Sequence, residues 1–225
     1  NSTTQQFQIT GQGFGSQIGE VMLGTNSLIV LRWRDDSITA QIPAGFMPPG
    51  PYQLTVTTAD GISTINGLTF HYFGTDEEYN PRIYRVGPGQ TYATIQAGVE
   101  AASAYTNDRG AMVLVFPGTP EQWNPNGYYL ENVVINKSIK LQGFGPGGPG
   151  VLGSVIDGRG ATGDTAAADA WRTLVQSKNW DGNQNVYEGP TIYILAEDGE
   201  FVEDIRRRTM IDGLAIQGGN HQGFP

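Results

Sequence analysis

The chain has 225 residues, a formal net charge of −9 at pH 7 and no cysteine. The negative charge argues against a nucleic acid or an anionic membrane surface as partner, because their phosphates would be repelled. The lack of cysteine excludes disulfides, thiolate metal sites and a cysteine nucleophile. The 32 glycines and a charged fraction of 16% are typical of a turn-rich β protein. No apolar run approaches the roughly 20 residues that a membrane-spanning helix needs.

Residues 1–73 predict a series of short strands with turns between them. Strands are expected at residues 7–10, 20–23, 28–33, 37–42, 52–58 and 68–73. Residues 37–42 alternate apolar and polar side chains, which is the pattern of a half-buried antiparallel strand. Connectors such as Pro48-Pro49-Gly50 and Asp60-Gly61 supply turn residues. So many short strands in about seventy residues indicate a small β-sandwich.

The order of these segments resembles an IPT/TIG domain, which has an Ig-like fold. The resemblance rests on Ile9-Thr-Gly-Gln-Gly-Phe-Gly15, Trp33 and Pro49-Gly-Pro-Tyr-Gln-Leu-Thr-Val56, and it spans the whole module. The family occurs in surface receptors, polysaccharide-acting enzymes and some transcription factors, so the resemblance implies a spacer or an interaction module. Its DNA-binding members use basic loops, whereas Arg32 and Arg34 are the cations here. DNA binding is therefore not expected.

Residues 74–84 are predicted to form a linker between two domains. They contain the acidic run Asp76-Glu-Glu78 and the dipeptide Asn80-Pro81. The predicted domains are residues 1–73 and residues 85–225.

The second domain is predicted to begin with a Gly-Pro-Gly turn and a short amphipathic helix within residues 86–102. Thr91 is expected to cap the first turn of this helix. A helix this short is not stable alone, so its apolar face must cover something. We expect it to cover the first coil of a β-solenoid. The predicted apolar face consists of Tyr92, Ile95, Val99 and Ala102.

Short β-branched strands with glycine-rich corners follow this helix. Val155-Ile-Asp-Gly158 is echoed by Met210-Ile-Asp-Gly213, and Ile139-Lys-Leu-Gln-Gly143 is echoed by Leu214-Ala-Ile-Gln-Gly218. Such recurrence indicates stacked coils, each of which buries its inward side chains against its neighbours.

Residues 86–102, 113–118, 130–143 and 155–158, taken in order, resemble the start of a pectin-lyase-like right-handed parallel β-helix. The resemblance implies an all-β protein in which an Ig-like sandwich precedes the cap helix and first coils of a β-helix. It also implies that catalytic groups would lie on later coils. Residues 218–225 stop in mid-coil, so a further C-terminal part or another chain is expected to complete the stack.

Two excursions, at residues 117–127 and about 160–189, interrupt the predicted coils. Residues 166–174 of the second are rich in good helix formers. Exposed aromatic rings in such loops suit stacking on sugar rings, whereas packing of the loops onto the solenoid is the structural alternative. The candidate ligand-binding residues are Trp123, Tyr128, Trp171 and Trp180.

Two polar stretches are candidates for cation binding. Asp181, Asn183 and Asn185 alternate oxygen ligands as a calcium loop does, but Val186 stands where an EF-hand needs glycine. A polar surface loop is the alternative. The second stretch is either a cation or acid/base site or a charged loop whose charges neutralise one another. It comprises Glu197, Asp198, Glu200, Glu203 and Asp204, followed by Arg206-Arg-Arg208.

These observations predict a secreted or cell-surface protein that engages polysaccharide. Any lyase, esterase or hydrolase activity would reside in coils beyond this chain, and no catalytic residue is assigned. The alternative is a non-catalytic structural or adhesive surface protein, in which the solenoid is a rigid stalk. Calcium is the one cofactor that the sequence suggests.

Overall fold

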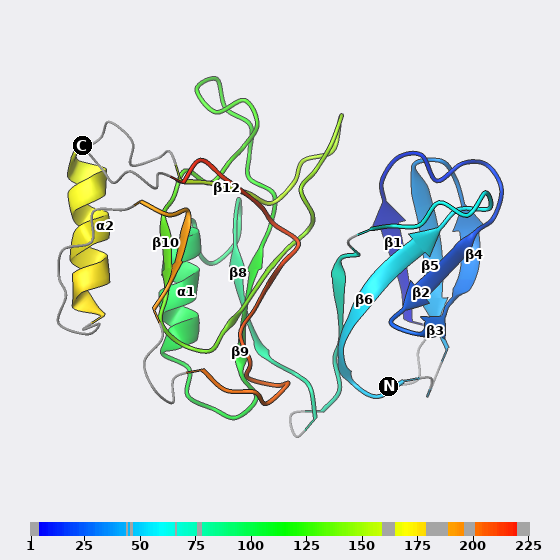
Figure 1. The fold of residues 1–225 in the computed structure, drawn as a ribbon, viewed down its shortest axis with the longest axis horizontal. Helices are drawn as coiled ribbons and strands as arrows, with labels where there is room; N and C mark the ends of the chain where they lie inside the picture. The colour runs from blue at the N-terminus through cyan, green and yellow to red at the C-terminus, as the bar shows by residue number, and fades with distance from the viewer. Residues whose placement is uncertain are drawn as a thin grey trace. The chain divides into compact units, whose positions relative to one another are not determined.

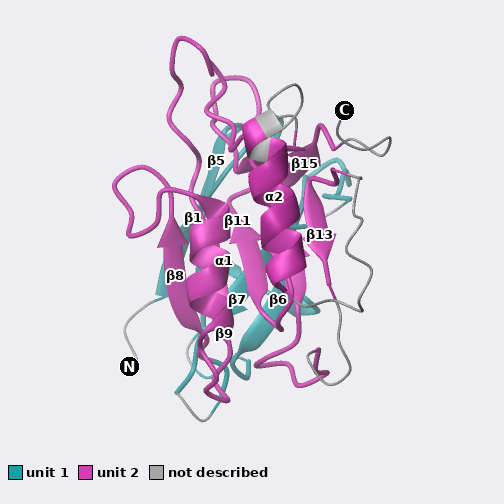
Figure 2. Ribbon diagram, turned by 90° about the vertical axis from the view of Figure 1, so that its left-hand side faces the viewer, with its two compact units in different colours: residues 1–79 teal, residues 80–225 magenta. Residues whose placement is uncertain are grey.

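The computed structural model describes residues 5–43, 45, 47–65, 67–75, 78–158, 165–178, 189–195 and 201–219. The chain forms two compact units, residues 1–79 and 80–225 (Figure 2). The α-helices among the described residues, α1 (Ile95–Ser103) and α2 (Thr165–Ser177), belong to the second unit (Figure 1). Strands make up the rest of the regular structure, which confirms the prediction of a mostly β protein. Within these ranges, no helix has the length and apolar character to cross a membrane.

The first unit contains two antiparallel sheets, with the orders β1-β5-β4 and β3-β2-β6-β7. The strands are β1 (Gln5–Thr10), β2 (Glu20–Leu23), β3 (Asn26–Ser27), β4 (Ile29–Trp33), β5 (Ser37–Ile42), β6 (Gly50–Thr57) and β7 (Thr69–Tyr72). The alternating residues Ile38, Ala40 and Ile42 of β5 are buried. They share one core with Val21 of the other sheet. The alternation in the sequence therefore marks the inward face of β5 in an Ig-like sandwich.

The connection between the units is shorter than the predicted linker of residues 74–84. Tyr79 is buried, its ring stacks on His71 of β7 at 5.9 Å between centroids, and its hydroxyl lies 2.6 Å from His71 Nδ1. Strand β8 (Arg82–Val86) begins three residues later. The chain is thus anchored in the first unit up to Tyr79, and residues 82–84 form strand rather than linker.

The second unit consists of short parallel strands in three sheets. Besides β8 they are β9 (Ala111–Val115), β10 (Val133–Ile135), β11 (Lys140–Gly143), β12 (Val155–Asp157), β13 (Ile192–Ile194), β14 (Met210–Asp212) and β15 (Ala215–Gln217). The largest sheet has the order β14-β11-β9-β8. Three consecutive strands, β10, β11 and β12, pair in the same order with β13, β14 and β15. The segment that contains β10, β11 and β12 therefore runs alongside the segment that contains β13, β14 and β15.

The recurring sequence segments do not stack on one another. Val155 pairs with Ala215, and Lys140 pairs with Met210. The Ile-Asp-Gly segment at 155–158 therefore lies beside the Ile-Gln-Gly segment at 214–218, and not beside its own echo. Strands β10, β11 and β12 are buried throughout, whereas their partners β13, β14 and β15 are partly exposed.

Helix α1 covers the core of this second unit, as the amphipathic pattern predicts. Its buried residues are Ile95, Gly98, Val99 and Ala102. A Cβ atom on Gly98 would lie 2.5 Å from Val86 Cγ2, so the helix packs directly on β8. The N-cap is Thr94 rather than Thr91, and its side chain accepts a hydrogen bond from Ala97 N at 3.3 Å. The helix starts later than predicted because Tyr92 still exchanges backbone hydrogen bonds with residues 85 and 87.

Two polar side chains fix α1 against its surroundings. Gln96 Nε2 donates to Val134 O at 3.4 Å, and Gln96 Oε1 accepts from Val134 N at 2.8 Å. The side-chain amide of Gln96 thus occupies the place of a neighbouring strand beside β10. The carboxylate of Glu131 accepts hydrogen bonds from the backbone N–H groups of Ile95 and Gln96 at 2.8 and 3.0 Å. Burial raises the pKa of this carboxyl.

Candidate ligand-binding hollow

The loop of residues 117–128 leaves β9 and is closed at its base by two glycines. A Cβ atom on Gly118 would lie 2.2 Å from the carbonyl oxygen of Gly127, and Gly127 itself has a φ of +63°. A side chain on Gly118 would push the two ends of the loop apart, and one on Gly127 would strain the left-handed backbone. The loop can close on itself because both positions are glycine.

Asn124 holds the interior of this loop. Its Nδ2 donates to Tyr128 O at 2.8 Å, and its Oδ1 accepts from Tyr128 N at 3.0 Å. Its backbone exchanges two hydrogen bonds with Glu121, at 2.9 and 3.0 Å. These bonds fix the turn that carries Gln122 and Trp123. The side chain of Trp123 is nevertheless exposed, at 71%.

An open hollow of about 380 Å³ lies between the loop and the turn of residues 87–90, and we call it the loop hollow. This volume is within the range of small-molecule sites. The described residues that line it are Gly87, Pro88, Gly89, Gln90, Ala93, Gly118, Thr119, Glu121, Asn124, Gly127, Tyr128 and Tyr129.

The loop hollow is lined by both polar and apolar groups, and Glu121 is the one charged residue in its described lining. Tyr129 donates a hydrogen bond from its hydroxyl to Phe116 O at 2.7 Å, and burial raises the pKa of Tyr129 to about 12. Its phenol is therefore neutral at physiological pH. Glu121 supplies a carboxylate acceptor, and Gln90 supplies an amide that both donates and accepts. Hydroxyl, amide and carboxylate groups can bind sugar hydroxyls, and the exposed indole of Trp123 on the same loop can contact the apolar face of a sugar ring.

One family model matches the first unit. Residues 1–72 are similar to the IPT/TIG domain family. This similarity supports the Ig-like part of the predicted fold. The loop hollow lies outside the matched residues.

Part of the chain is also similar to a solved structure. A crystal structure of gamma-CGTase from alkalophilic Bacillus clarkii is 27% identical, covering 40% of this chain and 13% of its own, at a TM-score of 0.30. A TM-score this low does not establish a shared fold. No curated protein matches the chain.

The predicted ligand-binding residues have different surroundings. Tyr128 lines the loop hollow, and Trp123 stands on the same loop. Trp171 is instead 4% exposed and belongs to the core between α2 and the sheet of β10 and β13. Its prediction as a sugar-binding residue is corrected, because the apolar face of α2 carries it inward. Trp180 and the predicted calcium ligands Asp181, Asn183 and Asn185 lie outside the described residues.

Sequence reasoning missed the second wall of the loop hollow and the residues that shape it. Gln90 and its turn were assigned only to the entry of the helix, and Glu121 and Asn124 were not singled out. The run Asn124-Pro-Asn-Gly127 is a turn signal that could have indicated an ordered loop. The approach of this loop to residues 87–90 is a tertiary contact that no local pattern reveals.

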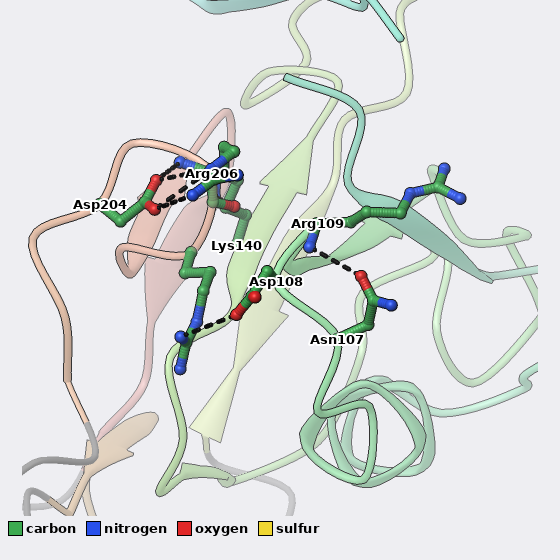
Figure 3. Close-up of polar contacts among 7 residues, drawn as sticks. Asn107, Asp108, Arg109, Lys140, Asp204 and Arg206 are labelled. Carbon is green, nitrogen blue, oxygen red and sulfur yellow. Dashed lines mark hydrogen bonds and ion pairs between the residues drawn. The ribbon is translucent and has the colours of Figure 1, made fainter. Parts of the chain in front are cut away.

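Within the charged group near residue 206, Asp204 and Arg206 pair with each other (Figure 3). Arg206 Nη2 lies 2.6 Å from Asp204 Oδ2, and Arg206 Nε donates to both carboxylate oxygens at 3.1 Å. The hydrogen bonds from Arg206 hold the pKa of Asp204 at about 2. Arg207 pairs with Asp108 at 3.3 Å. These contacts favour the prediction of a locally neutralised loop. Glu197, Asp198 and Glu200 lie outside the described residues.

Lys140 stands beside this group. It is 1% exposed, and its Nζ donates to Arg206 O at 2.6 Å. Burial, with a smaller contribution from Arg208, lowers the pKa of Lys140 to about 8. Among the described residues, no three His, Asp or Glu side chains are grouped so that they could hold a metal ion.

Proposed function

We propose that the chain is a secreted or cell-surface protein that binds carbohydrate in the loop hollow. The observation that carries this proposal is the side chain of Trp123, 71% exposed on a turn whose backbone Asn124 fixes. An indole presented on an ordered turn loses little conformational entropy when a ligand stacks on it. A large aromatic side chain left in water, on the loop that lines the hollow, supports an interaction site there.

The second unit, in this proposal, is the beginning of a right-handed parallel β-helix. The ordered pairing of β10, β11 and β12 with β13, β14 and β15 supports this architecture. The position of α1 over the core supports its role as the cap of the first coil. A further C-terminal part or another chain would continue the stack on the last three strands.

Binding rather than cleavage is the proposed role of these residues. Glycoside hydrolysis commonly uses a pair of carboxyl groups on either side of the scissile bond. Glu121 is the one carboxylate among the described residues that line the loop hollow. Any lyase, esterase or hydrolase activity is proposed to lie on coils beyond this chain.

Affinity electrophoresis of the whole chain through gels that contain neutral or uronic-acid polysaccharides tests this function. We expect at least one polymer to retard the wild-type protein, Trp123→Ala to abolish the retardation, and Leu130→Ala to retain it. Leu130 is a suitable control because it is a 42% exposed apolar residue that lies outside the loop of residues 117–128. Retardation by none of the polymers, or equal retardation of Trp123→Ala, would contradict the proposal.

A further inference from the structure

A second exposed aromatic side chain lies next to the loop hollow. Phe144 is 49% exposed, and its ring contacts that of Phe116 in a tilted arrangement, with 4.8 Å between centroids and 38° between planes. Phe116 in turn adjoins the hollow, because a Cβ atom on the lining residue Gly87 would lie 3.0 Å from Phe116 Cβ. The surface of the hollow therefore continues through Phe116 to Phe144.

The backbone that carries Phe144 is fixed. Ser154 Oγ donates to Val115 O at 2.6 Å and accepts from Phe144 N at 2.9 Å, so one buried hydroxyl ties the two phenylalanine segments together. Gly148 and Val151 exchange two backbone hydrogen bonds, at 2.9 and 3.0 Å, within the hairpin that follows. Phe144 is thus presented in a defined place, as Trp123 is on the neighbouring loop.

The charges along this surface select against an anionic ligand. Residues 144–153 contain no charged side chain. The described lining of the loop hollow contains the carboxylate of Glu121 and neither lysine nor arginine. A uronate or a sulfated sugar would have to lose water next to a like charge, without a cation to compensate. Uncharged sugars meet no such cost.

We infer, on the basis of the proposed function, that Phe144 is a second subsite and that the ligand is an uncharged glycan chain. The chain occupies the loop hollow with one sugar and continues across Phe116 to stack a further ring on Phe144. Aromatic faces contact the apolar faces of pyranose rings, and the polar groups of the hollow bind hydroxyls of the first sugar. The chemical class is therefore a neutral polysaccharide rather than a polyuronate.

Isothermal titration of the whole chain with ladders of β-1,4-linked glucose, mannose, xylose and galacturonate oligomers, one to eight units long, tests this inference. For a neutral ladder we expect affinity to rise with length and then level off. Phe144→Ala should lower the affinity for the longest oligomers about 3- to 10-fold and leave that for the shortest unchanged. Leu152→Ala is the matched control, since Leu152 is 47% exposed on the same hairpin.

The outcomes separate the inference from the function on which it rests. If no oligomer binds the wild-type protein, carbohydrate binding itself is contradicted. If neutral oligomers bind through Trp123 but Phe144→Ala shows the wild-type dependence on length, the second subsite is wrong while the function stands. If galacturonate oligomers bind more tightly than every neutral ladder, the assignment of an uncharged ligand is wrong.

Discussion

The loop of residues 117–128 and helix α2 are both insertions between strands of the second unit, and each carries a tryptophan. Trp123 is 71% exposed, whereas Trp171 is 4% exposed. The loop closes on itself through Gly118 and the hydrogen bonds of Asn124, so it leaves its indole in water. Helix α2 places Trp171 on an apolar face that packs against the sheet. Trp123 can therefore contact a ligand because its loop is held together by other groups, whereas Trp171 is needed for the packing of its helix.

Trp171→Ala should produce the largest effect and act on stability alone. We expect a loss of about 3–5 kcal/mol in the unfolding free energy of the second unit, because a large buried side chain leaves a cavity. Urea unfolding followed by circular dichroism measures the loss. Carbohydrate binding should stay at the wild-type level under native conditions. A loss below about 1 kcal/mol would show that α2 is not part of the core.

The stability of the protein should depend on pH through Lys140 and not through either insertion. The pKa of Lys140 in the folded protein is about 8, below its unfolded value of about 10.4. Between these values the unfolded chain binds more protons, so stability rises with pH. We expect the unfolding free energy to rise by about 2 kcal/mol from pH 8 to pH 10.

The two variants identify the group responsible for this rise. Trp171→Ala should show the same rise in unfolding free energy as the wild-type protein, because tryptophan carries no group that titrates between pH 8 and pH 10. Lys140→Met should lack it. A rise that persists unchanged in Lys140→Met would assign the titration to another group.

Gly118→Ala should affect stability and binding together. The new Cβ atom would meet the carbonyl oxygen of Gly127 at 2.2 Å, so the base of the loop must open. We expect a cost of about 1–2 kcal/mol and at least a tenfold loss of affinity for the polymer that binds. Gly148→Ala is the control, because no atom lies within 4 Å of its Cβ position. Normal binding by Gly118→Ala would mean that closure of the loop does not shape the site.

Trp123→Ala should have the smallest effect on stability. We expect the unfolding free energy to change by no more than about 0.5 kcal/mol, while affinity falls about tenfold or more. Thermal unfolding and titration of the same samples measure both quantities. A stability loss like that of Trp171→Ala would remove the contrast between the two insertions.

Local patterns predicted the elements of this protein better than their contacts. The alternation in Ser37–Ile42 gave β5, and the spacing of Ile95, Val99 and Ala102 gave the buried face of α1. The cap moved from Thr91 to Thr94 because strand-like pairing continues through Tyr92. This pairing is invisible in the helix pattern itself.

The candidate site was predicted only in part, for a similar reason. Trp123 and Tyr128 could be proposed from their residue types and their place in a loop. Residue type alone does not distinguish Trp171 from them. The difference is that Ala168 and Val175 lie on the same buried face of the helix as Trp171. Gln90 joins the hollow only because residues about thirty positions later fold back on it.

The contact of Gln96 with β10 gives the second unit a direction. A strand edge normally offers its N–H and C=O groups to any passing chain, and this can lead to unwanted association. Here a side-chain amide occupies those groups of Val134, and it cannot propagate a ladder as a backbone would. Growth by strand addition is therefore blocked on the α1 side of β10. If other chain segments add to this unit through backbone hydrogen bonds, they can add only at the side away from α1. The resulting assembly would have two different ends, with α1 at the blocked one.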